Sequence, residues 1–180
     1  MLMADHVVFS STFEALVRAL GPKLDESGKA RFKAIGVDFD ARLLPAYTQE
    51  TWLSAMQIGS DLLMPGESKE AQYYNLGHRI VASFAETMVG RALVAMMRVI
   101  GPRRALGRMT RNLRAANNFT ETSFAMLDDG RCAVTCSPIV STEFFRGLFT
   151  GSVEAAGGSD VRVELLSVKE GTGTFSISWK

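Results

Sequence analysis

Arginine is the residue type with the clearest chemical potential in this 180-residue sequence. The segment from Met88 to Thr120 contains seven arginines and no Asp, Glu or Lys. Arg104, Arg108 and Arg111 follow the i, i+4, i+7 spacing that places side chains on one face of a helix. A guanidinium presents a planar fork of donors that suits phosphate and carboxylate groups. The segment therefore predicts a cationic binding face.

We expect that face to consist of Arg98, Arg103, Arg104, Arg108 and Arg111. Its ligand would be a small anionic molecule or an acidic protein surface. Nucleic acid is the runner-up, because no aromatic residues interleave with the arginines to stack on bases. A simpler interpretation stays open, in which acids elsewhere in the fold balance a solvated face, because the net charge is only +1.

The histidines and cysteines indicate a binding or catalytic site less strongly than the arginines do. His78 falls within an expected helix and has no His, Cys or carboxylate three or four residues away, so a structural or surface role is favoured and a haem ligand is the alternative. Cys132 and Cys136 lie about 13 Å apart along an expected strand, too far for a disulfide. With Val134 they form the inward face of that strand. We expect no metal site, because the chain has only two histidines and two cysteines.

Gly147 and Gly151 form a ridge of small residues, one helical turn apart, that continues at Ala155. Such a ridge lets another surface approach closely. We expect it to pack on the protein's own sheet, with ligand contact or a homodimer contact as alternatives. The middle helices are rich in methionine and aromatic residues, which indicates an ordinary core or, alternatively, a cavity for a lipid-like ligand. This set comprises Met56, Met64, Met88, Met96, Met97, Met109, Trp52, Tyr73, Tyr74 and Phe84.

Motifs of nucleotide enzymes and serine hydrolases are missing from the sequence: GxGxxG after a strand, GxxxxGK[ST] and GxSxG. With two histidines, a nucleophile–histidine arrangement has little to work with. We therefore expect a protein that is not an enzyme and uses no cofactor.

The elements that must position these residues are helices first and strands later. Apolar residues recur at helical spacing up to Asn117, with breaks at Gly21–Pro22, Gly36, the segment 64–66, Gly90 and Gly101–Pro102. Ser10 or Ser11, Thr48 and Ser68 are the expected helix caps. From Thr120 the period changes to two, and a turn is expected at Asp128-Asp129-Gly130.

The expected fold is a single α+β domain spanning residues 1–180. A helical N-terminal two-thirds packs on a mostly antiparallel sheet made by two C-terminal hairpins, 120–137 and 161–179, with an intervening helix over 141–158. The short run His6–Ser11 is an expected strand that could join this sheet. Hydrophobic residues make up 47% and charged residues 22%, no stretch is long enough to span a membrane, and the N-terminus is unlike a signal peptide, so we expect a cytoplasmic protein.

Three stretches carry a resemblance to a known family: VVFSSTFEALVRALG, GHRIVASFAETMVGRALVAMMRVIGPRRALGRMTRNLRAANNF and EFFRGLFTGSVEAAGGSDVRVELL…GTFSISW. Over nearly the whole chain the sequence resembles a paralogous family of myxobacterial proteins of about this length and of uncharacterised function. More distantly, FFRGLFTGSVEAAG and the following strand pair are similar to the end of vinyl-reductase-type and haem-nitric-oxide-associated sensor domains, which share a fold with TRAPP subunits.

That resemblance implies a domain that binds a small or lipid-like ligand or a partner protein, and that dimerises. The chain departs from ligand-bearing members at 143–146, where it offers no cysteine or histidine as a metal or acyl ligand. The favoured function is a non-enzymatic bacterial signalling, sensor or scaffold module that binds a small anionic or lipid-like ligand or a protein. The alternatives are a nucleic-acid-binding regulator that uses the arginines of 103–114, and a haem sensor that uses His78.

Overall fold

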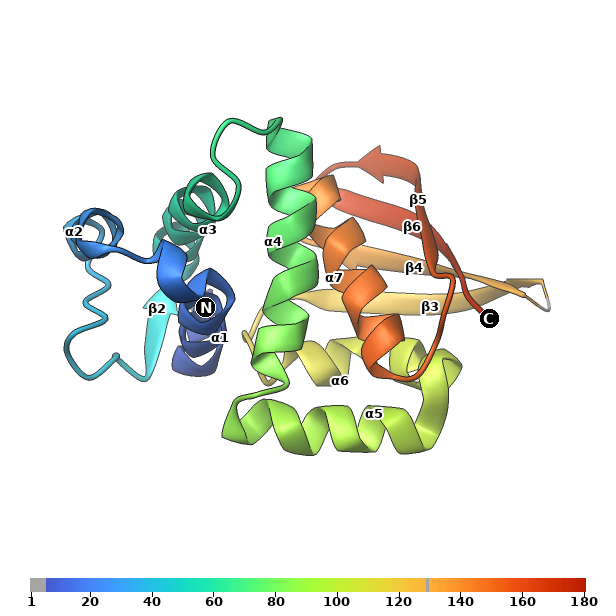
Figure 1. Ribbon diagram of the computed structural model, residues 1–180. Coiled ribbons are helices and arrows are strands. Elements are labelled where there is room, and N and C mark those ends of the chain that lie inside the picture. Colours follow the sequence, from blue (N-terminus) through green and yellow to red (C-terminus); the bar gives the residue numbers. More distant parts are fainter. Residues whose placement is uncertain (1–5, 129) are drawn as a thin grey trace, which may run out of the picture.

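The computed structural model describes residues 6–128 and 130–180, and most of its helices precede its main sheet (Figure 1). The first part contains β1 (Val7–Phe9), α1 (Ser10–Leu20), a 3₁₀ turn (Gly21–Lys23), α2 (Glu26–Ala34), β2 (Ala46–Thr48), α3 (Gln49–Leu63), α4 (Lys69–Phe84), α5 (Met88–Gly107) and α6 (Met109–Leu113). The second part contains β3 (Glu121–Asp128), β4 (Arg131–Ser137), α7 (Thr142–Ala155), β5 (Arg162–Lys169) and β6 (Thr172–Ser178).

The main sheet has four antiparallel strands in the order β3-β4-β6-β5. The two hairpins join where β4 pairs with β6, with Val134 opposite Phe175. This confirms the predicted α+β class, the two hairpins and the helix between them. The predicted turn at Asp128-Asp129-Gly130 includes Asp129, which lies outside the described residues.

The N-terminal strand does not join that sheet. β1 pairs with β2, and Val8 lies opposite Tyr47 in a separate two-stranded sheet. The prediction that this strand extends the C-terminal sheet is therefore wrong. Its partner was missed because β2 is only three residues long, and a single alternation is too short a pattern to recognise.

Side-chain caps start most of the long helices. Thr48 and Ser68 accept hydrogen bonds from the backbone N–H three residues later, as predicted, and Ser141 does the same for α7. Another predicted cap is wrong, because α1 begins at Ser10, after Phe9, with no side-chain cap. The break before α5 also lies earlier than Gly90, since α4 ends at Phe84 and Thr87 caps α5.

The hydroxyl groups near the start of α1 serve a long-range contact instead. Ser11 Oγ donates to the carbonyl of Ala115 at 3.0 Å, and Thr12 Oγ1 donates to the carbonyl of Ala116 at 3.1 Å. The backbone N–H of Phe9 also donates to the carbonyl of Ala116. The start of the chain is thus bonded to the segment that follows α6.

Glycines bring α4 and α7 into backbone contact (Figure 1). A Cβ on Gly147 would overlap the carbonyl oxygen of Tyr74 and lie 2.8 Å from the backbone nitrogen of His78. A Cβ on Gly77 would likewise overlap the carbonyl oxygen of Phe144. The expected close contact of this ridge is therefore present, but its partner is α4 and not the sheet.

The opposite side of α7 packs on the sheet. Phe149 of α7 and Phe175 of β6 are fully buried, with ring centroids 5.2 Å apart. Cys132, Val134 and Cys136 are also fully buried on the inward face of β4, as predicted. One helix thus joins the helical half to the sheet.

The longest helix, α5, has a kink. Gly101 has φ of 75° and Pro102 follows it, so the helical path is interrupted there. Among the described residues no single helix has the length and apolar character to cross a membrane; α4 and α5 meet that measure only as a pair, with a bend of 95° between them.

The close contact between α4 and α7 predicts that adding a single methyl group there strongly destabilises the protein. Gly147→Ala should lower the free energy of unfolding by about 3 kcal/mol or more, because backbone atoms of α4 have no room to move aside. Gly107→Ala is the matched control, since its Cβ would lie 3.8 Å from the nearest atom outside its own helix turn. Urea unfolding of both variants measures the difference, and equal stabilities would contradict this account of the contact.

Candidate functional site

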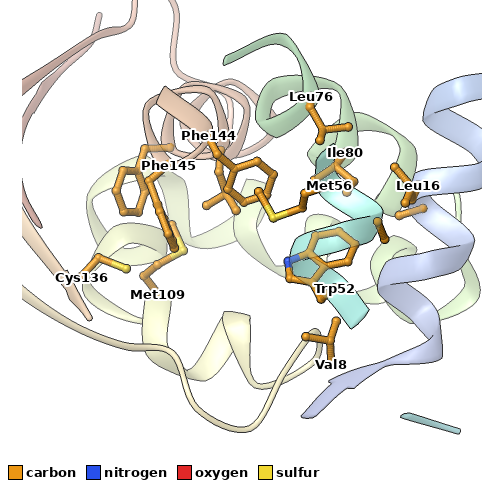
Figure 2. Close-up of a cluster of buried hydrophobic side chains, with 14 of the residues drawn as sticks. Val8, Leu16, Trp52, Met56, Leu76, Ile80, Met109, Cys136, Phe144 and Phe145 are labelled. Atoms are coloured by element: carbon orange, nitrogen blue, oxygen red, sulfur yellow. The ribbon is translucent and has the colours of Figure 1, made fainter. Parts of the chain in front are cut away.

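A cavity of about 120 Å³ lies where the helical half meets α7. Its wall is mostly aliphatic and aromatic. Figure 2 shows Val8 and Trp52 on the side of the N-terminal helices, and Phe145 and Met109 toward the sheet. The lining residues are Val8, Thr12, Ala15, Trp52, Ile80, Val81, Phe84, Leu93, Met97, Met109, Asn112, Leu113, Ala116, Asn117, Phe119, Thr120, Pro138, Val140, Phe144, Phe145, Leu148 and Ser152.

The wall combines segments that are distant in sequence. β1 and α1 supply residues from the start of the chain, α4 and α5 from its middle, and α7 from its last quarter. Apolar cavities that are lined by a few polar groups are the usual form of small-molecule sites. This cavity is therefore the best candidate site in the described part of the chain.

Charged groups are missing from the wall. Among the described residues that line the cavity there is no Asp, Glu, Lys, Arg or His. The polar members are Thr12, Asn112, Asn117, Thr120 and Ser152. The cavity thus offers neutral hydrogen-bonding groups but no general acid, base or counter-ion.

Asn112 stands out within this set. Its side chain is 7% exposed, and its Nδ2 donates to the carbonyl of Ala105 at 3.1 Å. Its Oδ1 is buried without a hydrogen-bond partner, a status that among the described residues it shares with Oε1 of Gln72. Sequence reasoning missed Asn112. The sequence does contain an indication of its position, because Asn112 lies three residues after Met109 and so falls on the buried side of a helix whose other residues on that side are apolar.

The predicted arginine face is on the surface and away from the cavity wall. Arg98, Arg103, Arg104, Arg108 and Arg111 are all exposed, and within the described residues none of them forms an ion pair. Their predicted continuous helix is interrupted, because Arg108 lies between α5 and α6 with φ of −109°. Arg114, by contrast, pairs with Glu121.

His78 is also on the surface. Its Nε2 lies 2.7 Å from Oε2 of Glu154, so the side chain bridges α4 and α7. The backbone of His78 packs directly against Gly147 and Gly151 of α7, so α4 occupies the space beside these two glycines. No group of three or more His, Cys, Asp or Glu side chains is placed to hold a metal ion within the described ranges.

The methionines divide between the core and the surface. Met56, Met97 and Met109 are buried, as expected of core residues, and the last two line the cavity. Met88 is 82% exposed, contrary to the prediction that it belongs to the core. It lies in the first turn of α5.

The two thiols should be unreactive in the folded protein. Burial raises the pKa of Cys132 to about 11 and that of Cys136 to about 12. Because the thiolate is the reactive form, native protein at pH 8 should react with a thiol reagent at least tenfold more slowly than unfolded protein.

The raised pKa values also predict a dependence of stability on pH. The unfolded thiols ionise near their ordinary pKa, so this contribution to stability is complete below about pH 8.5 and is lost as the pH rises towards 11–12.

Mass spectrometry of the labelled protein, with and without urea, counts the reactive thiols. Rapid labelling of both in native protein would contradict the burial of β4.

Comparison with known proteins shows the sequence family of this chain and the solved structures that have a similar fold. The family described as "Protein of unknown function (DUF2378)" matches residues 6–180. No functionally curated protein is similar enough in sequence to be matched.

Several solved H-NOX domains have a similar structure. An oxygen-binding H-NOX domain related to soluble guanylate cyclases, in its oxygen complex, has a TM-score of 0.62 at 15% identity, over 95% of this chain and 92% of that one. A mutant H-NOX from T. tengcongensis has a TM-score of 0.61 at 16% identity, over 95% and 96% of the two chains. A structure described under modulation of haem redox potential by porphyrin distortion has a TM-score of 0.62 at 16% identity, over 95% and 93%.

These matches confirm at the level of fold the predicted resemblance to haem-nitric-oxide-associated sensor domains. They lend no support to the vinyl-reductase-type and TRAPP resemblances. The matching sequence family is one of unknown function, as predicted, and covers nearly the whole chain.

The described residues of the cavity do not fit haem. Protein ligands to haem iron are typically His, Cys, Tyr or Met paired with His. The wall, as far as the structure describes it, has no His, Cys or Tyr, so its Met97 and Met109 lack a histidine to pair with, and His78 is bound to Glu154 outside it. A volume of about 120 Å³ is close to that of a cavity that holds one benzene molecule, and no cation in the wall could pair with propionate groups.

Proposed function

We propose that this chain, which belongs to the DUF2378 family of proteins of unknown function, is a sensor module that binds a small, mostly apolar ligand in its cavity. The observation that carries the proposal is the apolar wall, to which the helical half and α7 both contribute. The H-NOX likeness supports a sensing role by analogy of fold, since fold alone does not establish function.

We propose a non-enzymatic role, and the chemistry of the wall supports it. Its described residues supply no acid, base or charged stabilising group, so the cavity can bind but has no means to transfer a proton. Its apolar character favours the lipid-like ligand of the two classes predicted from sequence. The anionic class has no counter-ion inside the cavity.

Binding here would be communicated through the fold. A ligand in the cavity contacts α1, α4, α5, α6 and α7 together, so any rearrangement of one of these helices changes the fit. A ligand shifts a conformational equilibrium only by its differential affinity for the two states. We propose that the bound state holds these helices together and that a partner in a bacterial cytoplasmic signalling pathway recognises it.

Filling the cavity should abolish binding without unfolding the protein. Wild-type protein should bind benzene or toluene, seen as a ligand-dependent rise in melting temperature and in ligand-detected NMR. Ser152→Leu places a larger apolar side chain in the wall and should weaken binding at least tenfold. Ser123→Leu, at an exposed position on β3, is the matched control and should bind as wild type does.

Two results would count against this proposal. One is unchanged binding of aromatic probes to Ser152→Leu. The other is a Soret band on titration with haem that disappears in His78→Ala, which would favour a haem sensor. Native mass spectrometry of freshly purified protein would show any ligand that is carried along.

A second candidate function uses the arginine face. Arg104 and Arg108 are exposed and have no acidic partner in the described part of the chain, and Met88 and Val99 of α5 are 82% and 87% exposed. Cationic and apolar groups exposed along one segment of the chain suit an acidic protein surface better than a nucleic-acid backbone, which would leave the apolar side chains uncovered. This face is the candidate output surface of the sensor.

Charge reversal tests the second candidate. The Arg104→Glu/Arg108→Glu double variant should lose at least tenfold in affinity for poly-L-glutamate, measured by fluorescence anisotropy at low salt. Arg162→Glu/Lys169→Glu reverses two exposed cations on β5 and should bind as wild type does. Tighter, salt-dependent binding of duplex DNA that only the first variant loses would favour the nucleic-acid regulator instead.

A further inference from the structure

We propose that the ligand of this cavity is electrically neutral and carries one hydrogen-bond donor, which donates to Oδ1 of Asn112. The inference rests on the proposed function, because it assumes that the cavity holds a ligand. It adds the chemical class of that ligand and the residue that selects it.

The geometry of Asn112 fixes the role of its oxygen. Its Nδ2 donates to the carbonyl of Ala105, and its backbone N–H donates to the carbonyl of Arg108 at 3.0 Å. Rotating the amide by 180° would direct its oxygen at the Ala105 carbonyl and lose that bond. The amide is therefore held with its acceptor unpaired.

Two other polar residues of the wall have partners within the protein. Thr12 donates to the carbonyl of Ala116, and Oδ1 of Asn117 accepts from the backbone N–H groups of Phe119 and Thr120. Asn112 is thus the described wall residue that has a buried side-chain atom, Oδ1, without a hydrogen-bond partner. A buried acceptor without a partner is costly, so a donor in the cavity gains more there than it would at a solvated site.

The same wall disfavours anions. A carboxylate has only acceptor atoms, which would face the Asn112 oxygen, and the described wall contains no Lys, Arg or His to balance the charge of any anion. The volume of about 120 Å³ suits one aromatic ring or a short hydrocarbon segment. The ligand class is therefore a small alcohol, phenol or amine in its neutral form, with an apolar body.

Phenol and toluene form a matched pair of probes, because they differ by exchange of a hydroxyl for a methyl group. The quantity to measure is the ratio of their affinities in wild type and in Asn112→Leu, which keeps the branched shape of the side chain and removes the acceptor; a ratio is used because the larger leucine affects both probes. We expect the phenol-to-toluene ratio to fall about tenfold in Asn112→Leu. Met109→Leu changes the wall without a polar group and should leave the ratio unchanged.

A second measurement needs no variant. In wild-type protein, phenol should shift the side-chain amide NMR signals of Asn112 further than toluene or fluorobenzene does, because these two probes contribute only the ring-current effect. An unchanged affinity ratio together with equal shifts would overturn the role of Asn112 and leave the cavity function standing. Tight binding of benzoate would overturn neutrality, and failure of every probe to bind would overturn the proposed function itself.

Discussion

Backbone contact between α4 and α7 is the constraint on which the rest of the structure depends. Gly77 and Gly147 each lie against a carbonyl group of the other helix, so the two helix backbones are in direct contact. The other side of α7 holds the sheet through Phe149 and Phe175. Because α4 and α7 also supply a large part of the cavity wall, the same contact fixes the shape of the candidate site.

Local signals in the sequence were enough for much of the fold. Thr48 and Ser68 mark helix starts because a hydroxyl at that position accepts a backbone N–H, and the change of period after Thr120 marks the strands. The pairing of β1 with β2 was beyond such signals, since it depends on residues about forty positions apart. The ridge at Gly147 was visible, but sequence alone could not show that Gly77 of α4 meets it.

The candidate site was harder to predict than the fold. Arginines and His78 drew attention because of their chemistry, yet the structure places both on the surface. The cavity is made mostly of residues that look like ordinary core, and Asn112 is the described wall residue whose buried side-chain oxygen has no hydrogen-bond partner. The chain thus shares a fold with H-NOX domains at 15–16% identity, and the described wall of its cavity carries neutral polar groups and no His, Cys or Tyr.

The bonds from Ser11 and Thr12 to Ala115 and Ala116 have a consequence for folding order. More than a hundred residues separate the partners, so the closing of this loop contributes strongly to contact order and slows folding. During synthesis from the N-terminus, α1 and β1 would wait for the segment after α6 to leave the ribosome before their outer hydrogen bonds could form. The helical half therefore cannot complete its native bonding early, and the cavity would form only in the last stages of folding.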